Sequence, residues 1–117
     1  MATTNTRYVD PNSTTGGDGT TNALTGAARA YVPQAARAVD GQAPDALLPL
    51  RQVKAIASEA ALQVTAKAMR VCGGAAFAKH LPVERFFRDA QAGAIMAPTN
   101  DMLKEFIGKA LLGIDLF

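Results

Sequence analysis

The chain has 117 residues, of which 49% are hydrophobic and 19% charged, and its formal net charge is +2. This length allows one domain, and the composition excludes a disordered or collagen-like chain. The 12 basic residues are scattered among 10 acidic ones, without the basic stripe and interleaved aromatic residues that are typical of nucleic-acid-binding proteins.

Cysteine content and apolar runs bear on the cellular location. Cys72 is the single cysteine, so no disulfide can form within the chain, which favours a reducing compartment. The N-terminal stretch lacks the apolar core of a secretory signal. No apolar run approaches the roughly 20 residues that a membrane-spanning helix needs. The sequence therefore predicts a cytoplasmic protein.

The first 21 residues are mostly Thr, Asn, Gly, Ser and Asp. Such a segment cannot bury enough apolar surface to offset the entropy lost on ordering it. We predict a flexible arm over residues 1–21 and one helical domain over residues 22–117.

Apolar residues at helical spacing predict a first helix that begins at Asn22, a capping residue, and ends at Gly41. Pro33 lies in the middle of this helix. It should kink or split the helix, because proline removes one backbone donor.

The second predicted helix is the longest, with its first turn at Pro49 and its end at Gly73-Gly74. Its apolar residues fall three or four positions apart: Leu50, Val53, Ala57, Ala60, Val64, Ala68 and Val71. Pro49 suits the first turn, and Gly73-Gly74 supplies the left-handed residue that often closes a helix. Charged residues, Lys54 among them, lie mostly off the apolar stripe.

Two shorter helices follow. Pro82 opens the third, which should end at Gly93 and turn four residues inward: Val83, Phe86, Phe87 and Ala90. The fourth begins near Pro98-Thr99 and carries one apolar face: Met102, Leu103, Phe106, Ile107, Ala110 and Leu111. No stretch shows the two-residue alternation of a strand. The predicted fold class is all-α, a partial up-and-down helical bundle.

The sequence GGAAF at 73–77, followed by HLPVERFFRDA at 80–90, resembles the C-terminal signature of the acyl-CoA dehydrogenase family. The resemblance covers about residues 23–117, and these residues match the signature: Gly73, Gly74, Phe77, Arg85 and Asp89. It implies the helical bundle of that family's C-terminal domain. It also implies FAD as the cofactor and the alpha,beta-desaturation of an acyl-CoA thioester as the reaction.

Family members also carry an N-terminal helical domain and a middle β-domain, which seat the flavin ring and the thioester. The resemblance therefore implies that this chain supplies the last quarter to third of such an enzyme. A protein partner or a homo-oligomer would complete the cofactor site.

The resemblance further implies cofactor contacts for Arg70, Gly73, Gly74, Thr99 and Asp101. The glycine amides would approach the pyrophosphate of FAD from a neighbouring subunit, and Arg70, where the family has Gln, can contact a phosphate through its charged fork. Thr99 would donate a hydrogen bond to the flavin from the start of the fourth helix. The alternatives are a helix C-cap and close crossing for the glycines, and simple capping for Thr99 and Asp101.

The position of the family's catalytic glutamate falls at Ala97, followed by Pro98 and Thr99. An alanine methyl cannot accept a proton, so we predict no catalytic residue in this chain. Three functions stay open: part of an acyl-CoA dehydrogenase-like oxidoreductase, a component of a related flavin-dependent monooxygenase, or a non-catalytic oligomerisation or assembly bundle.

The remaining polar residues of the signature are predicted to be structural. Arg85, Arg88 and Asp89 should be semi-buried and paired, and Cys72 should be a small core residue. His80 has no further ligand at metal-binding spacing, so no metal site is predicted.

Overall fold

The structure, a computed structural model, describes residues 20–115, and the side chains of residues 23–115. This part of the chain forms four α-helices and one short 3-10 helix and contains no strand, which confirms the all-α class. Their bounds are α1 (Thr20–Asp40), α2 (Leu47–Cys72), η1 (Gly73–Phe77), α3 (Val83–Ile95) and α4 (Asn100–Leu112). The predicted arm lies almost wholly outside the described residues.

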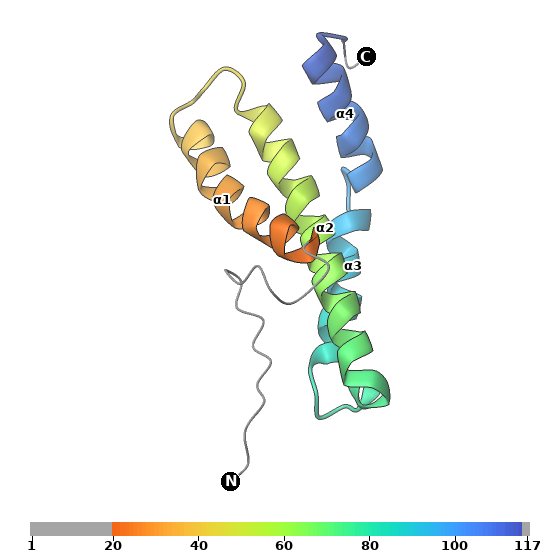
Figure 1. Ribbon diagram of the computed structural model, residues 1–117. Helices are drawn as coiled ribbons and strands as arrows, with labels where there is room; N and C mark the ends of the chain where they lie inside the picture. The colour runs from red at the N-terminus through yellow and green to blue at the C-terminus, as the bar shows by residue number, and fades with distance from the viewer. Residues whose placement is uncertain (1–19, 116–117) are drawn as a thin grey trace.

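The long helix α2 is the element against which the other helices pack (Figure 1). α1 runs antiparallel to it on one side. α3 returns along the C-terminal half of α2, and α4 then follows its N-terminal half, where the Arg51 guanidinium lies 5.4 Å from the centre of the Phe106 ring. The arrangement is the predicted partial up-and-down bundle.

The ends of α2 and α4 follow the sequence closely. Pro49 lies in the first turn of α2, where its missing N–H costs nothing. α2 ends at Gly73, whose φ of 57° suits glycine and whose N–H bonds to the carbonyl of Met69. Gly113 follows α4 in the left-handed conformation, and its N–H bonds to the carbonyl of Ala110.

The first helix differs from its prediction in two respects. α1 begins at Thr20, so Asn22 lies inside the first turn and does not cap the helix. Of the two outcomes predicted for Pro33, a kink or a split, the split does not occur, because α1 continues unbroken to Asp40. The cost of one lost hydrogen bond is outweighed by packing along α2, where Ala35 is fully buried.

The third helix does not end at Gly93 but continues to Ile95. Gly93 is instead the point where α3 crosses α2, because a Cβ built on it would lie only 3.2 Å from the Ser58 hydroxyl. The inward face of α3 is also narrower than predicted. Phe86 is 52% exposed, and the Arg85 guanidinium lies 5.5 Å from the centre of its ring.

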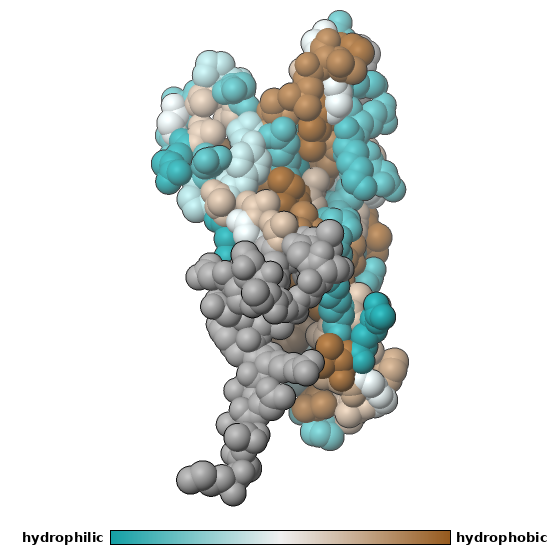
Figure 2. Space-filling model, in the orientation of Figure 1, coloured by the Kyte–Doolittle hydropathy of each residue, from teal (hydrophilic) through white to brown (hydrophobic). Residues whose placement is uncertain are grey.

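The core of the described residues is thin and rich in alanine. Its buried apolar residues are Ala35, Ala60, Ala76 and Leu103. Many larger apolar residues are exposed, and Figure 2 shows them over the C-terminal part of α4, where Leu111 and Leu112 lie. None of the described helices is both long and apolar enough to cross a membrane.

Candidate functional site

The glycine pair at the end of α2 has different requirements at its two positions. Gly73 needs to be glycine because its φ is 57°, whereas the φ of Gly74 is one that other residues adopt readily. A Cβ at Gly74 would meet no atom within 4 Å. Nothing among the described residues therefore explains glycine at position 74, and its backbone is open to approach from outside.

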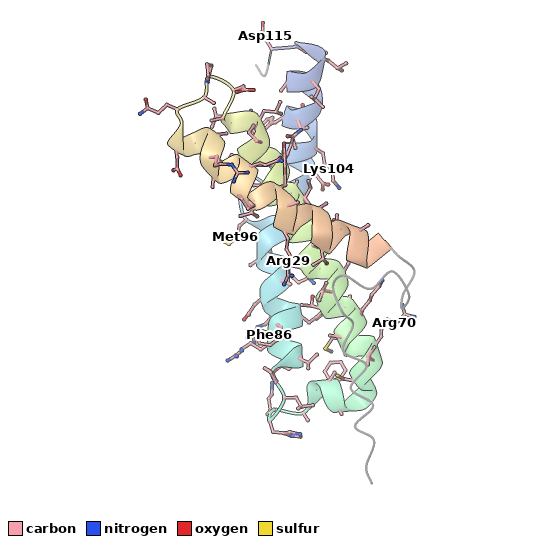
Figure 3. All side chains as sticks on the ribbon, turned by 60° about the vertical axis from the view of Figure 1, so that its left-hand side comes forward. Arg29, Arg70, Phe86, Met96, Lys104 and Asp115 are labelled. Atoms are coloured by element: carbon pink, nitrogen blue, oxygen red, sulfur yellow. The ribbon has the colours of Figure 1, made fainter. Side chains whose placement is uncertain are left out.

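Arg70 and Cys72 lie in the last turn of α2, beside this glycine pair. Both side chains are exposed, and Figure 3 shows Arg70 on the outer side of α2, away from α4. The prediction that Cys72 is a core residue is wrong, because Cys72 and its neighbours at positions 71–75 are exposed. No ion pair within residues 23–115 engages Arg70, so its guanidinium can meet an anionic group from another molecule.

The second group of predicted residues lies at the connection between α3 and α4. Ala97 and Pro98 are exposed, and Thr99 caps α4 by accepting a hydrogen bond from the N–H of Met102 at 3.3 Å. The Thr99 hydroxyl proton thus stays available for a second partner. Asp101 is exposed in the first turn of α4, 3.9 Å from the Lys104 ammonium.

Lys54 of α2, which was predicted to lie off the apolar stripe of that helix, holds this connection in place. Lys54 Nζ donates to the Pro98 carbonyl at 2.9 Å and to the Asn100 side-chain oxygen at 3.1 Å. One turn further along α2, Ser58 Oγ lies 3.0 Å from the Gly93 carbonyl. Ser58 and Asn100 are the buried polar residues of the described chain.

The structure does not bring the predicted cofactor residues into one site. A helix rises about 1.5 Å per residue, so about 24 Å separates Lys54, beside Thr99, from Arg70 along α2. Arg70, Gly73 and Gly74 form one group at the C-terminal end of α2. Thr99 and Asp101 form another beside its N-terminal half.

The charged residues of the signature lie on the surface of α3. Arg88 Nε is 3.3 Å from the Asp89 carboxylate, which confirms their pairing, but both side chains are exposed and not semi-buried. The Lys79 ammonium donates to the Glu84 carboxylate at 2.6 Å. This hydrogen bond, with the charge of Lys79, lowers the pKa of Glu84 below its usual 4.5. His80 is exposed nearby.

A groove of about 340 Å³ lies between α1 and α2, apart from both groups of residues. Ala27, Tyr31 and Gln34 line it from α1, and Gln52 and Ile56 from α2. The Tyr31 hydroxyl donates to the Gln52 side-chain oxygen and joins the two walls. The groove is open and mainly apolar, and its lining contains no carboxylate, histidine, cysteine or lysine.

Comparison with known proteins identifies the family. The family model of the acyl-CoA dehydrogenase C-terminal domain matches residues 19–112, which is most of the chain. The chain belongs to the acyl-CoA dehydrogenase family. The four helices of the described chain are those of this family's C-terminal domain, in agreement with the resemblance seen in the sequence.

Several known proteins are similar to about three-quarters of this chain. A probable acyl-CoA dehydrogenase, FadE25, of Mycobacterium tuberculosis is 37% identical over 86 residues, which are 74% of this chain and 22% of the relative. A cyclohex-1-ene-1-carbonyl-CoA dehydrogenase of Geobacter metallireducens is 36% identical over 86 residues, 74% of this chain and 23% of the relative. A 3-sulfinopropanoyl-CoA desulfinase of Paraburkholderia xenovorans is 34% identical over 87 residues, which are 74% of this chain and 22% of the relative. The chain thus spans less than a quarter of these relatives, and no solved structure matches it significantly.

Proposed function

We propose that this chain is the C-terminal part or a small subunit of an acyl-CoA dehydrogenase-like FAD oxidoreductase, which desaturates an acyl thioester between its alpha and beta carbons. FAD would supply the electron acceptor for this reaction. A protein partner or further copies of the chain would supply the remaining walls of the site. We expect the assembly to act in the cytoplasm.

Gly74 carries the proposal. The fold does not need glycine there, whereas a phosphate that approaches the backbone N–H groups of this turn would be blocked by a side chain. The exposed Arg70 lies in the preceding turn of α2 and can bind a phosphate through two parallel hydrogen bonds. These residues fit the pyrophosphate of a dinucleotide that is held mainly by another subunit.

Thr99 would contact a different part of the cofactor, because it lies beside the other half of α2. Its hydroxyl accepts from the N–H of Met102 and can donate to a flavin oxygen or nitrogen. Asp101 would border the same region at the start of α4.

The proposal is tested by co-expressing the chain with the N-terminal and middle domains of an acyl-CoA dehydrogenase and measuring bound flavin by its visible absorption. We expect Gly74→Val to reduce FAD binding about tenfold or more, because the added side chain blocks the backbone. Gly26→Val is the matched control, since a Cβ at Gly26 also meets no atom within 4 Å. Equal FAD binding by the two variants would overturn the assignment of Gly74.

Ala97 favours a second candidate, a flavin-dependent monooxygenase component of the same superfamily. Such an enzyme uses reduced flavin and oxygen and does not need a carboxylate at this place. Oxygen-dependent hydroxylation by the reconstituted assembly, without acyl-CoA oxidation, would select this function. An assembly that binds no flavin would leave the third candidate, a bundle that serves oligomerisation alone.

A further inference from the structure

Two side chains of α2, one helical turn apart, hold both ends of the connection between α3 and α4. The Ser58 hydroxyl lies 3.0 Å from the carbonyl of Gly93 in the last turns of α3 and 2.8 Å from the carbonyl of Lys54, so it shares its proton between the two helices. Lys54 reaches the carbonyl of Pro98 and the side chain of Asn100, the first residue of α4. Within the described residues, positions 94–97 make no hydrogen bond or ion pair to α2, so they depend on the two ends for their position.

Lys54 differs in its partners from three other lysines of the described chain. Lys79, Lys104 and Lys109 each lie within 4 Å of a carboxylate and belong to surface ion pairs. Lys54 instead donates to two neutral oxygens, one of them on the buried Asn100. A hydrogen bond from a charged donor is stronger than one between neutral groups, so Lys54 fixes the connection more firmly than a neutral amide would.

The position of Lys54 also determines where the Thr99 hydroxyl lies. Thr99 is the residue between the two that Lys54 contacts, and its Oγ1 is already held by the N–H of Met102. With the backbone fixed on both sides and one lone pair engaged, the remaining O–H has a restricted range of directions.

We propose that Lys54 is a positioning residue, which orders the connection between α3 and α4 so that the Thr99 hydroxyl is directed toward the flavin. The ordering of the connection is inferred from the geometry of the chain alone. The direction of the Thr99 hydroxyl toward the flavin rests on the proposed function. Lys54 itself need not touch the cofactor. It acts by binding Pro98 and Asn100, the two residues on either side of Thr99 in the chain.

The ordering is tested in the chain by amide hydrogen exchange of Met102 and Leu103, whose N–H groups bond to Thr99. We expect Lys54→Met to speed this exchange about tenfold or more, and Lys54→Arg to restore much of the protection. Lys104→Met, on the exposed face of α4, is the matched control and should leave the exchange unchanged. Circular dichroism checks the helix content, and Lys54→Gln replaces Lys54→Met if the latter does not fold.

The direction of Thr99 is tested in the reconstituted assembly through the flavin absorption spectrum and FAD affinity. Lys54→Met should shift the spectrum and weaken FAD binding, and Lys54→Arg should largely restore both. Unchanged exchange at Met102 and Leu103 would overturn the inference, whatever the flavin does. Faster exchange with an unaltered flavin spectrum would overturn the link to Thr99. Faster exchange in an assembly whose parent binds no flavin would support the ordering by Lys54 and overturn the proposed function.

Discussion

Gly93 and Gly108 are both glycines inside helices, yet their surroundings are opposite. A Cβ at Gly93 would lie 3.2 Å from Ser58 Oγ and 3.6 Å from Ser58 Cβ, whereas a Cβ at Gly108 would meet no atom within 4 Å. Glycine is kept at 93 by a close crossing of α2 and α3. At 108 it only weakens α4.

Alanine substitutions should therefore have opposite effects on the free energy of unfolding. Gly93→Ala should lower it by about 1 kcal/mol net, because the cost of overpacking exceeds the gain in helix propensity. Gly108→Ala should raise it by about 0.5–1 kcal/mol. Urea denaturation followed by circular dichroism measures both. If both variants became more stable to the same extent, the close crossing at Gly93 would be wrong.

The ion pair between Lys79 and Glu84 makes a prediction about pH. The pKa of Glu84 is lowered chiefly by the hydrogen bond from Lys79, so its contribution to stability is complete above the unfolded pKa of about 4.5. That contribution falls as the pH drops below 4.5 and is lost below the folded pKa. Lys79→Ala should bring the pKa of Glu84 back toward 4.5 in an NMR titration. A Glu84 pKa that did not change would show that Lys79 is not its partner in solution.

At the scale of the elements, the start of α4 depends on one side chain. Thr99 accepts from the N–H of Met102, and loss of such a cap costs about 1 kcal/mol. We expect Thr99→Ala to lower the free energy of unfolding by about this amount, while Thr99→Ser, which keeps the hydroxyl, should remain close to the parent. Equal stability of all three proteins in urea denaturation would mean that the cap is not formed.

The sequence predicted each of the four helices because each carries apolar residues at helical spacing and ends near Gly or Pro. It failed where packing outweighed local preference. Glycine costs a helix only about 1 kcal/mol, so the contact with Ser58 carries α3 past Gly93. Periodicity also cannot tell how much surface a neighbour offers, so Phe86 was wrongly predicted to face inward.

The candidate site was predictable only in part. Gly73 and Thr99 could be assigned their capping roles from the residues next to them. The contacts of Lys54 could not be predicted, because they join it to Pro98 and Asn100, which lie 44 and 46 positions further along the chain. A lysine and a serine four residues apart in α2 were the available signal, and this pattern is common on solvent-exposed helix faces.

At the scale of the whole molecule, the thin core predicts association. Leu111 and Leu112 are 65% and 74% exposed, and a small domain with little buried apolar surface has marginal stability. We expect the chain to self-associate or to bind a protein partner, as measured by light scattering. The double variant Leu111→Glu/Leu112→Glu should associate less than the parent chain. Lys104→Gln, on the polar side of α4, is the control and should associate as the parent does. A stable monomer of the parent chain would contradict this expectation.

Activity should also be a property of the assembly and not of this chain alone. Abstraction of an alpha proton needs a base within about 2.6–3.2 Å, and Ala97 cannot act as one. Asp101 and Glu105 are exposed on α4, and Glu105 lies 2.9 Å from the Lys109 ammonium. We expect no acyl-CoA oxidation by the isolated chain with FAD and an acceptor dye, and none by Ala97→Glu. Acyl-CoA oxidation by either protein would contradict this interpretation.

The central place of α2 has a consequence for how the described chain comes apart. α1, α3 and α4 make their main contacts with α2, so a fluctuation that detaches one of them leaves the other two in place. Such helices open locally with a small free energy, whereas the middle of α2 can exchange its amide protons only when everything around it has been lost. Unfolding would therefore proceed as a sequence of separate openings at the periphery, and a partner that covers any one outer helix would raise the barrier for that helix alone.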